Sequence, residues 1–244
     1  MGELQENVVC DFFRQLASHF ANSTEVPVGG SEVSGVREFF SQLAFKIEIS
    51  RQMQKDADVY LATRANIVRN YIQPDENRMS DILRDLLDPN GPHGQGSIFL
   101  QKFLQSVGAE GMRVHAHSAA IREHYTHAGR RLDLLVTFGD DEAIGIENKL
   151  DAEDQDRQVE DYCEYLRGRF SRHILYYLTD SGREPPPHSI APARRLKAAN
   201  TLRCISYQKD IPVWLEMCFR ECRAEKIRWF LRDLVEFIGD RFVD

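Results

Sequence analysis

The segment from residue 131 to residue 149 constrains the fold most, because two strand-like runs are separated by a single short turn. Both runs, Arg131–Phe138 and Ala143–Lys149, have the short β-type pattern of strands. The tetrapeptide Gly139-Asp140-Asp141-Glu142 between them is typical of a tight turn. The sequence therefore predicts an antiparallel hairpin, preceded by a third strand over Met112–Ile121.

Helical patterns lie on both sides of these strands. Before them, apolar stripes predict a helix over Leu4–Phe20, a turn-rich linker over residues 21–35 and one or two helices from about Val36 to about Tyr71. A further helix begins near Glu76, with acids in its first turn, and ends at Asp88-Pro89. We accordingly expect an N-terminal helical region, residues 1–70, packed on a core domain of residues 71–244. After the hairpin the pattern predicts a helix, two strands and two helices, over residues 154–167, 172–179, 202–207, 208–222 and 224–243.

Three charged residues gather on the predicted hairpin. Because side chains two apart on a strand share a face, Glu147 and Lys149 point the same way, and Asp133 can join them from the neighbouring strand. Two carboxylates about 4 Å apart repel by roughly 4 kcal/mol at an effective dielectric near 20, so such a cluster needs a cation or a shared proton. Mg²⁺ takes oxygen ligands and keeps several waters, which fits two carboxylates open to a phosphate substrate.

This arrangement resembles the PD-(D/E)XK nuclease superfamily, whose motif is an aspartate at a strand end followed by Glu-x-Lys on the next strand. Asp133 and Glu147-Asn148-Lys149 match the motif, and Leu132 stands where the family name has proline. The resemblance implies an α/β fold with a restriction-endonuclease-like core. Such a core is a mixed central sheet of about four or five strands flanked by helices, here with an N-terminal helical extension.

The resemblance also implies a metal site. Asp133 and Glu147 would hold Mg²⁺, for which Mn²⁺ could substitute, and the backbone carbonyl of Asn148 would be a further ligand. An upstream helical glutamate belongs to many such sites, and Glu76 opens a segment similar to bacterial and phage members. Glu76 would complete the carboxylate set directly or through water. The similarity covers about residues 71–222, and the first 70 residues match no family that we can place.

Three further residues receive catalytic roles from the same resemblance. Lys149 would orient the attacking water and stabilise negative charge on the transition state. The RecB-like branch of the superfamily adds a glutamine and a tyrosine on the next helix, which Gln158 and Tyr162 match. These two residues are four apart, hence on one helical face, and would orient Lys149 or the scissile phosphate. The expected products carry a 5′-phosphate and a 3′-hydroxyl.

Each of these residues has a structural alternative. A Glu-x-Lys by itself is usually a surface ion pair that contributes about 0–1 kcal/mol. Glu76 could serve only as a helix N-terminal charge, and Tyr162 could be a core residue. Arg131 could contact a phosphate or pair with a carboxylate. Two cysteines on one helical face, Cys218 and Cys222, could form an iron–sulfur site together with Cys163 and Cys204. Their spacing does not match that of the family's iron–sulfur members, so we expect no cluster.

The net charge of −7 argues at first against a nucleic-acid partner. However, residues 166–203 contain eight Lys or Arg and only two acids, a local charge of +6 that predicts a track for a phosphate backbone. His93 lies in a glycine-flanked loop, where it either caps the loop or contacts substrate. The candidate nucleic-acid contacts are Arg131, His93, Arg167, Arg169, Arg172, Arg194, Arg195 and Lys197.

The sequence also bears on location. Residues 1–11 carry acids and no basic residue, and no apolar run approaches the roughly 20 residues of a membrane span. Five cysteines, an odd number thinly spread, favour reduced thiols. We therefore expect a cytoplasmic protein without a membrane partner, with the N-terminal helices as a candidate surface for a second copy or a partner protein.

The resemblance as a whole favours a Mg²⁺-dependent nuclease that cuts DNA, in a setting such as phage defence or restriction. One alternative is a nucleic-acid-binding or assembly module that keeps the fold without cleavage. Retention of all the charged positions speaks against that alternative. A third hypothesis is a regulatory or dimerisation protein in which the first 70 residues carry the function.

Overall fold

The computed structural model describes residues 39–53, 62, 65–127, 129–150 and 152–242. The chain divides into two compact units, residues 1–64 and residues 65–244. In the described part of the first unit, residues 39–53 form an α-helix. The predicted helix over Leu4–Phe20 and the linker over residues 21–35 lie outside the described residues.

The second unit begins at Ala65, earlier than the predicted boundary. The long helix expected up to about Tyr71 is interrupted near Ala65. Ala65 and Asn66 are not helical, and η1 (Val68–Ile72) is a single π-helical turn. The cause is a tertiary contact: the buried side chain of Asn66 donates a hydrogen bond to the backbone carbonyl of Asp233 at 2.9 Å. Residues 65–70 therefore belong to the core unit, and the packing of the earlier residues on it stays a prediction.

Five strands form one mixed sheet in the order β1-β2-β3-β4-β5. The β1-β2 and β2-β3 pairs are antiparallel, whereas the β3-β4 and β4-β5 pairs are parallel. This α/β architecture is the predicted one, with five strands. The strands are β1 (Ala119–Tyr125), β2 (Arg131–Phe138), β3 (Glu142–Lys149), β4 (Arg172–Thr179) and β5 (Leu202–Ser206).

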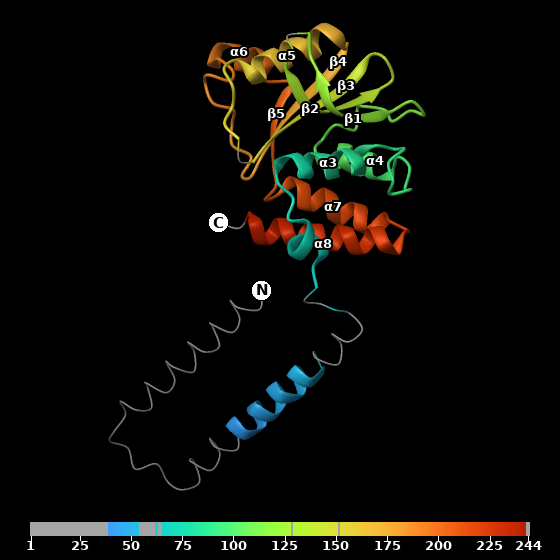
Figure 1. Ribbon diagram of the computed structural model, residues 1–244, viewed down its shortest axis with the longest axis vertical. Coiled ribbons are helices and arrows are strands. Elements are labelled where there is room, and N and C mark those ends of the chain that lie inside the picture. Colours follow the sequence, from blue (N-terminus) through green and yellow to red (C-terminus); the bar gives the residue numbers. More distant parts are fainter. Residues whose placement is uncertain (1–38, 54–61, 63–64, 128, 151, 243–244) are drawn as a thin grey trace, which may run out of the picture. The chain divides into compact units, whose positions relative to one another are not determined.

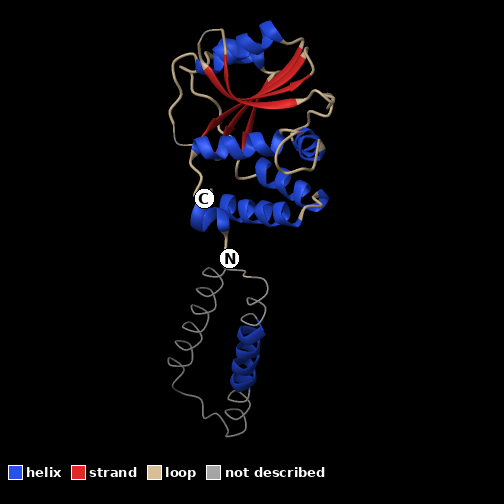
Figure 2. Ribbon diagram, turned by 45° about the vertical axis from the view of Figure 1, so that its right-hand side comes forward, coloured by secondary structure: helices blue, strands red, loops and turns tan. Residues whose placement is uncertain are grey.

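Helices cover both faces of the sheet. Figure 1 and Figure 2 show α5 and α6 on one face and the remaining helices of this unit on the other. The sequence patterns did not predict α4 and α6. None of the described helices combines the length and the apolar character needed to cross a bilayer. The helices are α3 (Glu76–Leu87), α4 (Ile98–Ser106), α5 (Gln158–Arg169), α6 (Pro192–Ala198), α7 (Asp210–Glu221) and α8 (Glu225–Arg241).

The predicted hairpin is confirmed. Strands β2 and β3 pair antiparallel from Leu134 opposite Ile146 to Phe138 opposite Glu142. In the turn, Gly139 has a φ of 71°, which a glycine adopts without the steric penalty of a side chain. The turn chemistry and the strand pattern therefore agree, and together they fix the register.

Two elements begin later than the sequence predicts. Strand β1 starts at Ala119, because the hydroxyl of Ser118 accepts the N–H of His115 at 2.8 Å and closes a turn just before the strand. Helix α5 starts at Gln158 rather than near Asp154, because the carboxylate of Asp154 accepts hydrogen bonds from other elements, among them the Ser189 hydroxyl at 2.9 Å. Local sequence pattern does not reveal such side-chain contacts.

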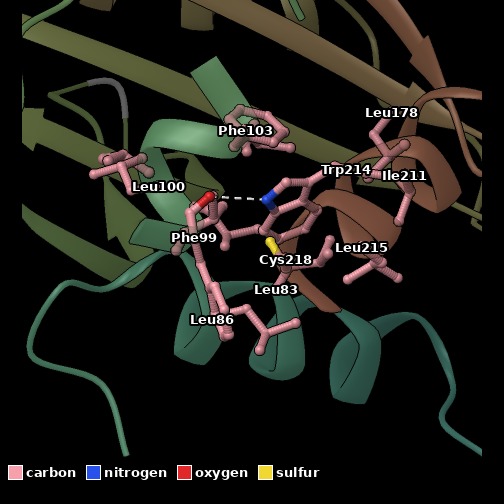
Figure 3. Close-up of a cluster of buried hydrophobic side chains, with 14 of the residues drawn as sticks. Leu83, Leu86, Phe99, Leu100, Phe103, Leu178, Ile211, Trp214, Leu215 and Cys218 are labelled. Atoms are coloured by element: carbon pink, nitrogen blue, oxygen red, sulfur yellow. Dashed lines mark hydrogen bonds between the residues drawn. The ribbon is translucent and has the colours of Figure 1, made fainter. Parts of the chain in front are cut away.

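Two buried apolar clusters hold the helices on the sheet. The larger fills the space between the sheet and the helices of the α3 side. In it Trp214 is fully buried and donates its indole N–H to the carbonyl of Phe99 at 2.9 Å, with Cys218 beside it (Figure 3). The smaller cluster lies under α5, where a Cβ on Gly145 would come within 3.0 Å of Leu166. The missing side chain at Gly145 thus lets α5 approach β3 closely, which brings the start of α5 to the end of β3.

Candidate active site

Strands β2 and β3 separate at the end of the hairpin, and this opening positions Asp133. The last paired residues there are Leu134 and Ile146. One residue earlier on β2, carboxylate oxygen Oδ2 of Asp133 accepts a hydrogen bond from the backbone N–H of Asn148 at 2.8 Å. A side chain thus replaces the backbone as the partner of β3 and brings the Asp133 carboxylate to the end of that strand.

Glu147 and Lys149 lie on the face of β3 that α5 covers. Their side chains form an ion pair, with Nζ of Lys149 3.5 Å from Oε1 of Glu147, and both residues are buried. Gln158 at the start of α5 donates its amide N–H to the same oxygen at 2.7 Å. The other oxygen, Oε2 of Glu147, is buried and accepts no hydrogen bond from the described residues. A buried carboxylate oxygen without a partner is costly and marks a position that a cation would stabilise.

A relay of hydrogen bonds continues from Gln158 into α5. The amide nitrogen of Gln158 also lies 3.1 Å from the hydroxyl of Tyr162, which donates to the backbone carbonyl of Arg131 at 2.7 Å. The amide oxygen of Gln158 accepts the N–H of Gln155 at 2.9 Å, which fixes the orientation of the amide. The pair therefore contacts the carboxylate of Glu147 and the backbone of β2, rather than the ammonium group of Lys149.

Asn148 points to the opposite face of β3, as alternation along a strand requires. Its amide nitrogen donates to the hydroxyl of Ser80 at 2.9 Å and to the backbone carbonyl of Glu76 at 3.1 Å. Its amide oxygen accepts from the hydroxyl of Tyr207 at 3.1 Å. The side chain thus ties the start of α3 to β3, while the role of the Asn148 backbone carbonyl as a metal ligand stays a prediction.

Glu76 is the first residue of α3, but it is not the cap of that helix. Asp75 is the N-cap and accepts the N–H of Arg78 at 2.8 Å. The carboxylate of Glu76 instead reaches the segment after β3 and accepts the N–H groups of Leu150 at 2.9 Å and Ala152 at 3.3 Å. Its position beside the end of β3 therefore does more than complement the helix dipole.

Arg122 of β1 belongs to the site, although no motif or spacing in the sequence predicts it. Its guanidinium donates to the backbone carbonyl of Asp133 at 3.1 Å and lies 3.5 Å from carboxylate oxygen Oδ1 of that residue. The same group contacts Asp81 at 2.9 Å and the side chain of Asn77 at 3.2 Å on α3. Arg122 thus joins the helix that begins at Glu76 to the strand that carries Asp133.

Burial makes the carboxylates of this cluster hard to ionise. It raises the pKa of Asp133, against the lowering effect of the Asn148 N–H and the Arg122 guanidinium, and the nearby Glu76 carboxylate adds to the rise. Burial also raises the pKa of Glu147 well above its usual range, with the neighbouring Asp133 carboxylate as the next cause and Lys149 in opposition. The folded cluster therefore favours a bound proton or cation.

The donor set fits a hard divalent metal ion that keeps waters of its own. Asp133 and Glu147 offer carboxylate oxygens from adjacent strands, and the free Oε2 of Glu147 is already desolvated. Within the described ranges, no three Asp, Glu, His or Cys side chains converge into a metal cage. Two carboxylates completed by water and substrate oxygens are typical of Mg²⁺ rather than of a closed structural site.

The raised pKa values predict a pH-dependent stability of the metal-free protein. Because the folded state binds the Asp133 and Glu147 protons more tightly than the unfolded state, this stabilisation is complete below about pH 4 and declines as pH rises toward the folded pKa. We expect the free energy of unfolding in chelator to fall as pH rises above about 5, by at most about 1.4 kcal/mol per pH unit for each group. Glu147→Gln, which cannot ionise, should flatten the fall.

Urea unfolding at several pH values measures this slope. Glu216→Gln is the matched control, because Glu216 lies on α7 with an exposed side chain paired to Arg220. An unchanged slope in Glu147→Gln would show that Glu147 does not titrate in this range.

The predicted basic track does not begin at the site. Arg172 lies opposite the start of β3, five residues before Glu147, which is about 16 Å along the strand. Arg167 and Arg169 lie in the last turn of α5, whose opposite end holds Gln158. These three residues are therefore remote from the Asp133 and Glu147 carboxylates.

The other candidate cations are engaged or lie on α6. Arg131 forms an ion pair with Glu123 at 3.1 Å, which matches the carboxylate alternative. Arg194 lies 3.7 Å from Glu160 of α5, and Arg195 pairs with Glu184 in the loop between β4 and α6. Lys197 is exposed on α6. As phosphate contacts these four residues stay predictions.

His93 makes the loop-capping contacts that the sequence offered as one alternative. It is buried, its Nε2 lies 3.0 Å from the carbonyl of Asp88, and its Nδ1 accepts the N–H of Gln95 at 3.0 Å. Its ring also stacks on Phe99 at 4.6 Å. Both ring nitrogens are thus used within the fold, and a contact of His93 with nucleic acid stays a prediction.

A mixed sheet whose central hairpin joins an aspartate to a buried Glu-x-Lys defines the class of restriction-endonuclease-like nuclease folds. Residues 66–235 match the PD-(D/E)XK nuclease superfamily, and the chain belongs to this superfamily. The matched region starts with the core unit and extends into α8, beyond the predicted span of residues 71–222. No protein of curated function and no solved structure matches the chain.

Proposed function

We propose that this protein is a divalent-metal-dependent nuclease of the RecB-like type that hydrolyses phosphodiester bonds of DNA. The observation that carries the proposal is the state of Glu147: its carboxylate is buried, held through Oε1 by Gln158 and Lys149, and unsatisfied at Oε2. Asp133 stands beside it on the next strand. A purely structural ion pair has no need of a second, desolvated carboxylate.

The proposed roles follow from these contacts. Asp133, Glu147 and the backbone carbonyl of Asn148 would hold Mg²⁺, or Mn²⁺ in its place, and Glu76 would complete the set directly or through water. When bound, such an ion would supply positive charge to the scissile phosphate and a lowered pKa to a bound water. Lys149 holds the attacking water and offsets the negative charge that develops on the phosphate oxygens. The water oxygen bonds to phosphorus and the 3′ oxygen leaves, so the products carry a 5′-phosphate and a 3′-hydroxyl.

The biological setting in this proposal rests on the similarity to bacterial and phage nucleases. Phage defence or restriction inside the cytoplasm is the setting that suits such an enzyme. The competing function is a nucleic-acid-binding module without cleavage. It provides no cation to stabilise the buried, unsatisfied oxygen of Glu147.

A cleavage assay with matched variants tests the proposal. The full-length chain is incubated with linear duplex, circular duplex, single-stranded DNA and RNA, in Mg²⁺, in Mn²⁺ and in chelator. We expect cleavage only with metal, and rates about 10³-fold lower for Asp133→Asn and Glu147→Gln, because each removes charge that holds the ion. Glu216→Gln should cut at the wild-type rate. If the folded wild type cuts none of these substrates, or Glu147→Gln cuts equally well, the binding-module function takes the place of this one.

Replacing Gln158 is expected to have a smaller effect than replacing the carboxylates. Gln158→Leu removes the donor to Glu147 and to Tyr162, so the carboxylate loses its orientation. We expect metal affinity or cleavage rate to fall about 10–100-fold, the usual effect of removing a group that orients a ligand. Titration with Mn²⁺ separates the two effects. Gln101→Leu on α4 is the control, because this exposed side chain bonds Ser97 and no other residue in the described part of the chain.

A further inference from the structure

A hollow of about 290 Å³ lies beside α5, on the side of β1 and β2. Its lining includes His117, His124, Tyr165, Arg169 and Phe170. Aromatic rings and groups that can carry positive charge therefore share one cavity, a combination that the catalytic cluster does not have. The volume exceeds that of one water many times and suits a group of the size of a nucleotide base.

Arg169 carries the fixed positive charge of this hollow, and Asp140 is the acidic residue of its lining. The Arg169 guanidinium donates to the backbone carbonyl of Asp140 at 3.1 Å and lies 4.9 Å from the centre of the Phe170 ring. In the described ranges it forms no ion pair. Burial lowers the pKa of His124, and nearby His127 and Arg169 lower it further, so the three basic groups lie close enough to repel one another. An anion would relieve that repulsion.

Tyr165 provides a ring surface next to these charges. Its hydroxyl bonds to Nε2 of His124, and its ring centre lies 5.4 Å from that of His124 and 5.5 Å from that of His127. Proteins that bind single strands combine positive charge with aromatic rings on which bases stack. The hollow has both parts of that design.

Helix α5 links the hollow to the catalytic cluster. Gln158 at the start of α5 holds Glu147, and at about 1.5 Å per residue Tyr165 lies about 10 Å further along the helix and Arg169 about 16 Å. On the sheet, His124 pairs with Leu132, the residue before Asp133. At about 3.4 Å per stacked nucleotide, these distances correspond to roughly three to five nucleotides.

We propose that this hollow binds a nucleotide of the substrate strand about three to five positions from the scissile phosphate, in single-stranded form. Arg169 contacts a phosphate and the base stacks on Tyr165. A base inside a duplex is already stacked on its neighbours, so only an unpaired strand can use this surface. The proposal rests on the proposed nuclease function for the position of the scissile bond, but binding at the hollow can be measured without cleavage.

Binding of labelled oligothymidylates of 2, 4, 8 and 12 nucleotides, in chelator, tests the proposal by fluorescence anisotropy. For the wild type we expect affinity to rise sharply once the strand is long enough to span both sites, between 4 and 8 nucleotides. Arg169→Ala and Tyr165→Ala should remove that rise and weaken binding of the 12-mer about tenfold. Tyr165→Phe, which keeps the ring and loses the hydroxyl, should bind like the wild type. Blunt duplex binding should not depend on Tyr165.

Two controls match these variants. Arg220→Ala changes an exposed arginine of α7, and Tyr71→Ala changes a tyrosine that is 80% exposed in η1. Both should leave the length dependence unchanged. The proposal is overturned if Arg169→Ala and Tyr165→Ala, shown to be folded by their melting temperatures, bind all lengths like the wild type, or if duplex binding depends equally on Tyr165.

The outcome also separates this proposal from the nuclease function. If the chain cleaves with metal, and neither strand length nor the two substitutions change the rate, the proposed nucleotide site is contradicted and the nuclease function is supported. If binding depends on strand length, Arg169 and Tyr165 but the chain cuts no substrate, the hollow is supported as a nucleic-acid site and the nuclease function is contradicted.

Discussion

Replacing Lys149 with methionine is expected to lower the cleavage rate about 10²–10³-fold and to leave divalent-metal affinity equal to or higher than that of the wild type. The rate falls because the ammonium group is the positive charge nearest to Glu147, at 3.5 Å, and charge stabilisation of this kind is worth roughly that factor. Metal affinity is kept because the substitution removes a cation that competes for the same carboxylate. Methionine fills a similar volume, so the buried position should stay packed.

Two measurements on the same samples make this result distinctive. Cleavage is followed at saturating metal, and Mn²⁺ binding is followed by titration calorimetry. Glu147→Gln should lose both properties, whereas Lys149→Met should lose only the first. Lys226→Met, an exposed lysine of α8, controls for the loss of one positive charge. Cleavage by Lys149→Met within tenfold of the wild type would contradict the assigned role, as would a loss of metal affinity as large as that of Glu147→Gln.

Trp214→Ala is expected to reduce the free energy of unfolding by about 3–5 kcal/mol, the range for loss of a large aromatic core residue. Trp214 of α7 is fully buried against α4, and its ring packs edge-on to Phe103 with centres 5.2 Å apart (Figure 3). Its removal leaves a cavity and also leaves the carbonyl of Phe99 without its donor. Urea unfolding followed by far-ultraviolet circular dichroism measures the change.

The second tryptophan of the chain is the natural control for the first. Trp229 is 40% exposed on α8 and stacks under the guanidinium of Arg232 at 4.2 Å, a contact worth about 0.5–1 kcal/mol at an exposed position. Trp229→Ala should therefore destabilise the protein by about 1 kcal/mol. If Trp214→Ala lowers the free energy of unfolding by no more than Trp229→Ala does, the packing between α4 and α7 contributes less to stability than we expect.

Much of the core could be predicted from the sequence because its signals are local. Alternation and turn residues fixed the hairpin of β2 and β3, and the same alternation placed Glu147 and Lys149 on one face. A spacing of four residues on a helix placed Gln158 and Tyr162 on a common face, and the two side chains meet at 3.1 Å. In each case the geometry depends on a few consecutive residues.

Other parts of the site depend on contacts between distant residues. Arg122 lies on a strand that the sequence placed several residues too early, and its partners are 41 and 11 positions away along the chain. Tyr207 reaches Asn148 across 59 positions. Arg167 and Arg172 of the predicted basic track lie far from the carboxylates, because charge along the sequence does not say at which end of the sheet a residue lies. Their contact with nucleic acid stays a prediction.

The sequence by itself determined the hairpin, the two strands after it and the identity of the charged cluster, since period-two and period-3.6 patterns are properties of short segments. Only the tertiary structure decided which contacts each carboxylate makes: Glu147 with Gln158, Asp133 with Arg122, and Glu76 with the segment after β3. It also placed a hollow with aromatic and basic groups along α5. The physical reason is that burial and the partners of a charged group arise when remote elements pack, and these set the pKa values and the unsatisfied oxygen of Glu147.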